Sequence, residues 1–211
     1  MKKTSFFLLC SLILVIYSFS SFKPDKPSQK QGGQKQNSPA QTLSQTEMIQ
    51  RGKYLVNAIG CHDCHSPKVM GPNGPKVDES RPLSGHPAGN PLPPVNKEAL
   101  KNWILFNQEL TAFVGPWGVS YAANLTSDAT GIGNWTEKQF LTALRKGRYK
   151  GLESNRMLLP PMPWDMYGKL NDTDLKSIFA YLKTTKPIKN KVPAPQAPEM
   201  VSEAPAPSKT K

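Results

Sequence analysis

The stretch Gly60-Cys61-His62-Asp63-Cys64-His65 decides how this 211-residue chain is interpreted. It holds two of the three cysteines of the chain, separated by two residues and followed directly by a histidine. The third cysteine, Cys10, lies in an apolar N-terminal run and is assigned to that run. A disulfide between Cys61 and Cys64 would close a very small loop and would add little stability. The pair therefore predicts a chemical role rather than a structural crosslink.

The spacing C-x-x-C-H is the attachment signature of a c-type haem. On one helical turn the sulfurs of Cys61 and Cys64 can bond the two vinyl-derived carbons along one edge of the macrocycle. His65, the next residue, is then held beneath the iron. We predict one covalently attached haem c, with Cys61 and Cys64 as the attachment residues and His65 as the proximal axial ligand.

Two other uses of the cysteine pair fit the sequence less well. A thioredoxin-like redox pair would follow a strand in a βαβ unit, whereas residues 48–59 have a helical pattern. A closed zinc site needs four ligands. Beyond the two cysteines only His62, His65 and His86 remain as histidine ligands, so such a site is barely assembled. We interpret His62 as a free position of the motif and His86 as an ordinary loop histidine.

The sixth iron ligand is expected among the methionines that follow the motif. A haem that only transfers electrons has both axial positions filled, and in cytochromes c the second ligand is a methionine. Met70 is too near His65 in sequence to reach the opposite face of the macrocycle. Met162 lies between prolines that fix the backbone and remove competing N–H donors. Met162 is therefore the predicted distal ligand, with Met157 as the alternative.

The N-terminal segment 1–22 has the charged start, apolar middle and small-residue end of a secretory signal peptide. Its run from Thr4 to Phe22 carries no charge and is nearly long enough to span a bilayer as an uncleaved anchor. Both interpretations stay open. Either one places the protein in the periplasm or on the outer face of the cytoplasmic membrane, with membrane association through this segment in the second case.

Composition divides the rest of the chain into three parts. Residues 23–46 are predicted to be a disordered linker, and residues 191–211 a disordered tail rich in Pro, Ala and Lys, because both are nearly free of large apolar side chains. Residues 47–190 are long enough for one domain around one core. The formal charge of +12 is spread over all parts, without the basic stripe and interleaved aromatics typical of nucleic-acid binding.

The hydrophobic pattern predicts helices separated by long loops. Helices are expected at about 47–59, from Thr136, which can form a capping box with Gln139, to Gly147, and from Asn171 to a point before Pro187. The stretch 66–135 is rich in Gly and Pro and is expected to form long loops with one short helix at about 96–106. Five aromatic residues are candidates to line a haem pocket, although core packing is the simpler interpretation of each: Trp103, Phe113, Trp117, Tyr121 and Trp135.

Several motifs in the same order resemble a known family. They are Cys61-x-x-Cys64-His65, Ala123-Asn124-Leu125-Thr126 with the following Thr130 to Thr136, Pro161-Met162-Pro163-Trp164, and Leu170 to Leu175 through Ala180-Tyr181-Leu182. Over about 50–190 the chain resembles class I c-type cytochrome domains, in particular the haem domains of cytochrome c subunits of bacterial membrane alcohol and sugar-acid dehydrogenases. Those subunits usually carry several C-x-x-C-H motifs, and this chain has one. The resemblance implies an all-helical fold with His65 and Met162 as axial ligands.

These observations predict an electron carrier rather than an enzyme. Its expected partners are redox proteins, with a dehydrogenase or quinol oxidase as donor and a terminal oxidase or reductase as acceptor. Two alternatives remain open. The first is a haem enzyme or sensor with an open or displaceable sixth site, and the second is a haem subunit docked permanently in a membrane dehydrogenase complex.

Overall fold

The structure is a computed structural model that describes residues 43–203. The predicted leader, the linker up to residue 42 and the end of the tail from residue 204 lie outside the described residues. Within residues 43–203, no helix is both long enough and apolar enough to cross a membrane.

The three predicted long helices are confirmed. They are α1 (Gln45–Ala58), α3 (Glu137–Lys146) and α5 (Asp172–Leu182). Helix α3 begins at the predicted capping box, in which the Thr136 hydroxyl accepts from the Gln139 N–H and the Gln139 side chain accepts from the Thr136 N–H. Helix α1 has the same arrangement between Ser44 and Glu47 and begins two residues earlier than expected. Local capping chemistry therefore sets where these helices start.

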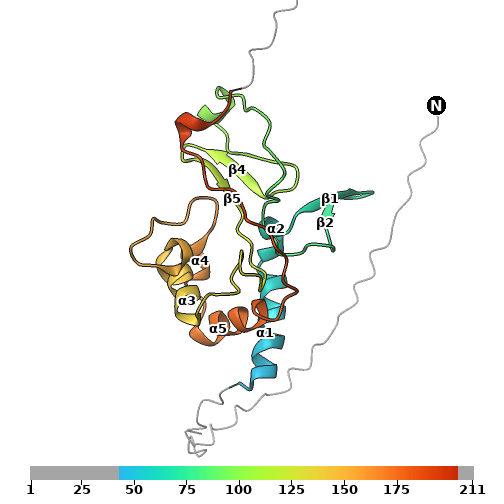
Figure 1. The fold of residues 1–211 in the computed structure, drawn as a ribbon, viewed down its shortest axis with the longest axis vertical. Helices are drawn as coiled ribbons and strands as arrows, with labels where there is room; N and C mark the ends of the chain where they lie inside the picture. Colours follow the sequence, from blue (N-terminus) through green and yellow to red (C-terminus); the bar gives the residue numbers. More distant parts are fainter. Residues whose placement is uncertain (1–42, 204–211) are drawn as a thin grey trace, which may run out of the picture. The chain divides into compact units, whose positions relative to one another are not determined.

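Helices α1 and α5 cross (Figure 1). The crossing lies at Gly52. A β-carbon built on Gly52 would lie 1.9 Å from the backbone oxygen of Ser177 and 2.8 Å from the β-carbon of Tyr181. Only glycine therefore allows the two backbones to approach this closely. An ion pair between Arg51 and the buried Asp174, at the first turn of α5, joins the helices beside the crossing.

The main core lies between these two helices and α3. The rings of Phe140 on α3 and Phe179 on α5 pack with centroids 5.3 Å apart. The buried members of this core come from α1, the two loop segments around residues 83 and 132, α3 and α5: Val56, Leu83, Ile132, Phe140, Leu144, Leu175, Ile178, Phe179 and Leu182.

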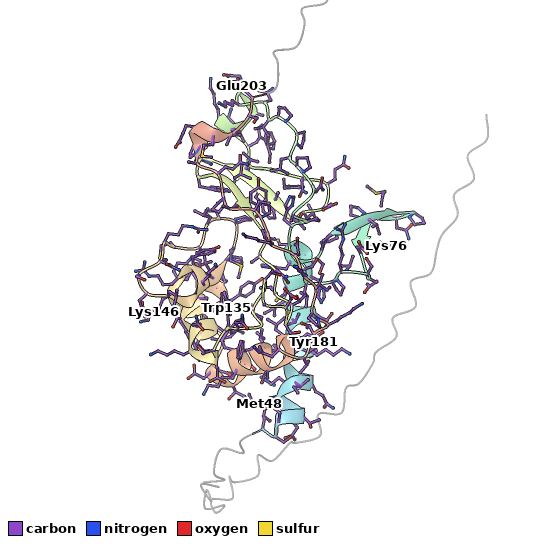
Figure 2. The ribbon with its side chains drawn as sticks, in the orientation of Figure 1. Met48, Lys76, Trp135, Lys146, Tyr181 and Glu203 are labelled. Carbon is purple, nitrogen blue, oxygen red and sulfur yellow. The ribbon has the colours of Figure 1, made fainter. Side chains whose placement is uncertain are left out.

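The expectation of an all-α domain is wrong, because the described residues 43–203 form helices together with two small antiparallel sheets. The first sheet pairs β1 (Lys68–Gly71) with β2 (Gly74–Val77). This hairpin projects beside the other elements, with Lys76 on it (Figure 2). The second sheet has the order β3-β4-β5 and contains three short strands: β3 (Leu105–Phe106), β4 (Ala112–Gly115) and β5 (Gly118–Tyr121).

The sequence pattern does not predict the strands, because buried and exposed residues do not alternate regularly along them. All four residues of β4 are buried, so the strand lacks the apolar–polar alternation of a half-exposed strand. The expected helix at 96–106 is reduced to the 3-10 turn η1 (Ala99–Lys101), and its last residues enter β3. Trp103, a candidate for the haem pocket, is 70% exposed.

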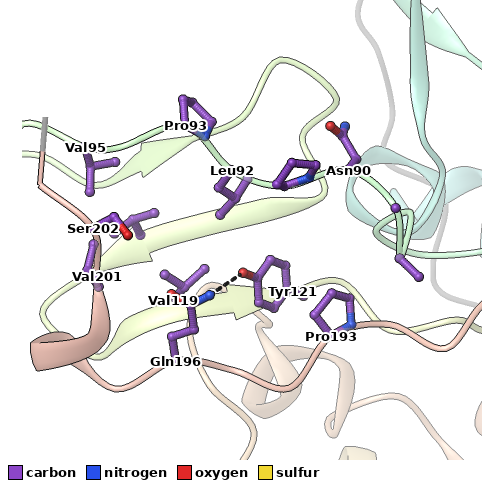
Figure 3. Close-up of a pocket in the computed structure, with 14 residues that line it drawn as sticks. Asn90, Leu92, Pro93, Val95, Val119, Tyr121, Pro193, Gln196, Val201 and Ser202 are labelled. Carbon is purple, nitrogen blue, oxygen red and sulfur yellow. Dashed lines mark hydrogen bonds between the residues drawn. The ribbon is translucent and has the colours of Figure 1, made fainter.

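Residues 191–203, which the sequence assigned to a tail, contact the three-stranded sheet. The backbone of Gln196 exchanges two hydrogen bonds with Val119 on β5, at 2.9 and 3.0 Å, and the Gln196 side chain donates to the Tyr121 hydroxyl (Figure 3). Val201 packs in a second, smaller core with Val119 and Val114. This segment therefore covers the outer edge of β5.

The helix crossing predicts a large effect of a small substitution. Gly52→Ala should lower the free energy of unfolding by about 3 kcal/mol or more, because the new methyl group overlaps the backbone of α5. Gly89→Ala is the matched control, since Gly89 is exposed and a β-carbon there meets no atom within 4 Å. Denaturant unfolding of both variants checks this, and equal stabilities would contradict the close crossing.

Candidate haem site

The cysteine motif forms a short helix that follows α1 after a sharp turn. Helix α2 (Cys61–His65) begins after Gly60, which has a φ of +80° in the left-handed region. A residue with a side chain would be strained there, so Gly60 lets the chain leave α1 and start a new helical turn. Cys61 and Cys64 are both free thiols on that single turn, as the motif predicts.

The end of α2 is held by polar contacts that satisfy its free carbonyl groups. The Lys68 ammonium donates to the carbonyl oxygens of His62 at 3.0 Å and Asp63 at 2.9 Å, and also to that of Ser66. The Ser66 hydroxyl accepts from the Leu83 N–H at 2.9 Å. These contacts are typical of a helix C-terminus stabilised by a cation, and they fix the orientation of the motif.

The ring of His65 has one nitrogen engaged and one with a lone pair. Its Nδ1 lies 2.7 Å from the carbonyl oxygen of Ala123. A carbonyl can only accept, so Nδ1 carries the proton and Nε2 keeps its lone pair. Burial lowers the pKa of His65, against an opposing effect of the Ala123 carbonyl. The imidazole is therefore neutral at neutral pH, in the tautomer that can bind a metal through Nε2.

Three backbone segments place the Ala123 carbonyl at His65. The Gly85 N–H donates to the His65 carbonyl at 2.8 Å, and the His86 N–H donates to the Ala122 carbonyl at 2.9 Å. The segment around residue 85 thus lies between α2 and the segment around residue 123. A β-carbon on Gly85 would lie 2.5 Å from the Ala122 oxygen, so the absence of a side chain lets the segments around residues 85 and 123 lie this close together.

The two thiols lie in an environment that keeps them protonated. Burial raises the pKa of the Cys61 thiol to about 11 and also raises that of Cys64. Cys61 packs against the main core, whereas Cys64 is less enclosed. Both are neutral thiols at neutral pH, and neither has the lowered pKa of a redox-active C-x-x-C pair.

Met162 packs against the same core as Cys61. It lies in a loop that leads into α4 (Trp164–Tyr167). The Tyr167 hydroxyl donates to the carbonyl of Ile59 at 2.9 Å, just before the cysteine motif. This hydrogen bond joins the segment that follows Met162 to the segment that precedes Cys61, although they are about a hundred residues apart in sequence.

Three other methionines that follow the cysteine motif lie toward solvent. Met157 is 39% exposed, and Met70 and Met166 are more exposed still. Their placement favours Met162 over Met157, whose role as an alternative ligand has the weaker support. Met162 as the sixth ligand stays a prediction.

The two remaining histidines have structural surroundings. His86 is fully buried, its Nδ1 lies 2.9 Å from the Thr111 hydroxyl, and its Nε2 lies 3.0 Å from the Asn90 carbonyl. Both ring nitrogens are therefore occupied. His62 has its Nδ1 2.8 Å from the Ser66 hydroxyl. These contacts give both histidines structural partners, and the absence of a ligand role stays a prediction.

Sequence reasoning missed the groups that orient the site. Ala123 acts through its backbone carbonyl and Gly85 through its lack of a side chain, so neither shows a chemical signature in the sequence. The hydroxyl of Tyr167 was missed as well, although a partly buried tyrosine usually finds a partner for its hydroxyl. The Ala123-Asn124-Leu125-Thr126 motif was recognised as part of the resemblance, without its contact to His65.

The residues present fit a covalently bound haem. Two free thiols lie on one helical turn, the adjacent histidine offers Nε2, and a methionine packs against the same apolar core as one of the thiols. Cys61 and Cys64 would hold such a group covalently, and His65 and Met162 would supply its axial ligands.

Comparison with known proteins finds similarity to cytochrome subunits of bacterial dehydrogenases. The chain is 43% identical over 163 residues to the fructose dehydrogenase cytochrome subunit of Gluconobacter japonicus, covering 76% of this chain and 26% of that one. It is 29% identical over 135 residues to the gluconate 2-dehydrogenase cytochrome c subunit of Pantoea cypripedii, covering 64% and 22%. It is 27% identical over 150 residues to the cytochrome c subunit of alcohol dehydrogenase (quinone) of Gluconobacter oxydans, covering 69% and 24%. No protein-family model matches the chain.

The predicted resemblance is thereby confirmed: over most of its length this chain is similar to cytochrome c subunits of bacterial dehydrogenases. That similarity implies a covalently bound haem c and a part in electron transfer. The chain spans about a quarter of the length of these relatives.

The buried His86 predicts how stability depends on pH. Burial lowers the pKa of His86, partly offset by the Asn90 carbonyl and Glu109, so the unfolded chain takes up this proton at a higher pH than the folded protein. The stability that the folded protein gains from keeping His86 neutral is therefore complete above about pH 6.5. It is lost as the pH falls below that value.

Denaturant unfolding of the holo-protein at several pH values between about 7.5 and 5 measures this effect. This range brackets the ordinary histidine pKa of about 6.5. The free energy of unfolding should fall more steeply in the wild type than in His86→Gln. A variant with the same slope as the wild type would show that His86 is protonated equally in both states.

Proposed function

We propose that this chain is an exported mono-haem c-type cytochrome that passes single electrons between redox partners. Cys61 and Cys64 attach the haem, His65 is its proximal ligand and Met162 its distal ligand. The bound haem supplies the chemistry, because its iron alternates between Fe(III) and Fe(II). The single observation that carries the proposal is the joint placement of Cys61 and Met162 against one core, next to a histidine whose Nε2 is free.

The residues around the haem would determine its properties. The Ala123 carbonyl holds the His65 ring in one tautomer and orientation, which increases the basicity of Nε2. The apolar core beside Cys61 and Met162 excludes water. A thioether ligand and a dry surrounding both raise the reduction potential relative to a water-exposed haem, and filled axial positions leave no place for a substrate. These features support an electron carrier over a haem enzyme or sensor.

The similarity to dehydrogenase subunits supports the catalytic subunit of a dehydrogenase as the electron donor. The acceptor would be a further redox protein such as a terminal oxidase or reductase. We place the protein in the periplasm or on the outer face of the cytoplasmic membrane, with residues 1–22 as a signal peptide or anchor. The residues before Ser44 would then act as the linker to the haem domain, which begins with the cap of α1 and includes the segment 191–203 that packs on the sheet.

The ligand set predicts an optical change in one variant. The oxidised wild type should be low-spin and show the Met-to-iron charge-transfer band near about 695 nm that is expected of His/Met ligation. Met162→Ala should lose this band completely. Met157→Ala is the matched control and should keep it, because Met157 lies partly in solvent.

Visible spectra and intact masses of the purified exported proteins together test the axial ligands and the number of haems. The mass should exceed that of the processed chain by one haem. A high-spin oxidised wild type, or a band that survives in Met162→Ala, would contradict the proposed ligand set.

A further inference from the structure

The loop that carries Met162 has few hydrogen bonds of its own. Pro160, Pro161 and Pro163 have no backbone N–H. Inside the loop, the Met162 N–H donates to the Leu159 carbonyl at 3.3 Å, and the Trp164 N–H donates to the Met162 carbonyl at 2.9 Å. A loop of this composition depends on donors from elsewhere to fix its position.

One such donor comes from the three-stranded sheet. The hydroxyl of Ser120 on β5 donates to the carbonyl oxygen of Pro160 at 2.6 Å. The same hydroxyl oxygen accepts from the indole N–H of Trp117 at 3.2 Å. Ser120 is 8% exposed, so its hydroxyl has little access to solvent. The indole directs the hydroxyl proton toward Pro160, because the oxygen accepts from one partner and donates to the other.

The strand that presents Ser120 is held on both sides. Side chains alternate along a strand, so Val119 points into the small core with Val201 while Ser120 points to the other face, toward Pro160. Strand β4 pairs with one edge of β5, and Gln196 pairs with the other edge at Val119. The sheet is therefore a fixed support from which one hydroxyl reaches the methionine loop.

The Trp117 side chain is fixed as well. A β-carbon on Gly115 would lie 2.5 Å from the outer edge of the Trp117 ring, so the ring lies directly on the backbone of the β4–β5 turn. The indole N–H is thus held in place to contact Ser120. Two donors in series, Trp117 and Ser120, connect the turn to the Pro160 carbonyl.

We propose that Ser120, oriented by Trp117, is a positioning residue that holds the Pro160–Met162 segment in its ligating conformation. This rests on the proposed ligation by Met162. The hydrogen bond is made only while the loop lies against the sheet. Its loss leaves the Pro160 carbonyl without a donor among residues 43–203 and raises the population of conformations in which Met162 has moved away.

Imidazole binding to the oxidised holo-protein tests the proposal. Imidazole competes with Met162 for the sixth position, and its apparent dissociation constant falls as the displaced population grows. Titrations are followed by loss of the band near about 695 nm, or by the Soret shift where that band is absent. Ser120→Ala should bind imidazole about 2- to 12-fold more tightly than the wild type, the range expected for loss of one hydrogen bond.

Two further variants separate the hydroxyl from packing and from general destabilisation. Ser120→Thr keeps the hydroxyl and should bind imidazole as the wild type does. In the Met162→Ala background the loop no longer competes, so adding Ser120→Ala should not change the imidazole affinity. If Ser120→Ala does not fold, Trp117→Phe keeps the ring and removes the N–H, and it should tighten imidazole binding about twofold or more, since one neutral hydrogen bond is lost.

The outcomes distinguish the two proposals. If Met162→Ala binds imidazole no more tightly than the wild type, the ligation by Met162 is wrong. If Met162→Ala behaves as expected but Ser120→Ala, or in its place Trp117→Phe, leaves the affinity unchanged, the positioning role is overturned. Equal tightening in Ser120→Ala and Ser120→Thr, or tightening that persists in the Met162→Ala background, overturns it as well.

Discussion

The close crossing of α1 and α5 at Gly52 is the constraint on which the site depends. With no side chain at this position, the backbone of α1 rests directly on that of α5 at Ser177. The crossing sets the direction in which α1 delivers Cys61 and Cys64, and it builds the core that both Cys61 and Met162 contact. The hydrogen bond from Tyr167 to Ile59 then joins the methionine side of the site to the end of α1. Helix packing thus brings together groups that are distant in sequence.

Backbone groups orient the side chains of the site. The neutral tautomer of His65 is fixed by the Ala123 carbonyl, and that carbonyl is placed by the layer of chain around Gly85. The three-stranded sheet contacts the loop that carries Met162, because the Ser120 hydroxyl on β5 donates to the Pro160 carbonyl. The three-stranded sheet would therefore help to hold the proposed ligand Met162 and is not merely an addition to a helical domain.

Features with strong local signals could be predicted from the sequence. The Thr136–Gln139 capping box marked the start of α3, and the spacing of Cys61, Cys64 and His65 was enough to indicate haem attachment. The four-residue strand β4 was missed because it is buried throughout and so has no alternation. The contact of Gln196 with β5 was missed because a polar, Pro-rich segment carries no signal for a partner far away in the chain.

The central claim is that one haem iron is held between His65 and Met162. X-ray absorption at the iron K-edge of the oxidised holo-protein measures the ligand atoms directly. We expect one sulfur ligand beside the nitrogen ligands in the wild type and in Met157→Ala, and nitrogen or oxygen ligands alone in Met162→Ala. A first shell without sulfur in the wild type, or a sulfur ligand that remains in Met162→Ala, would contradict it.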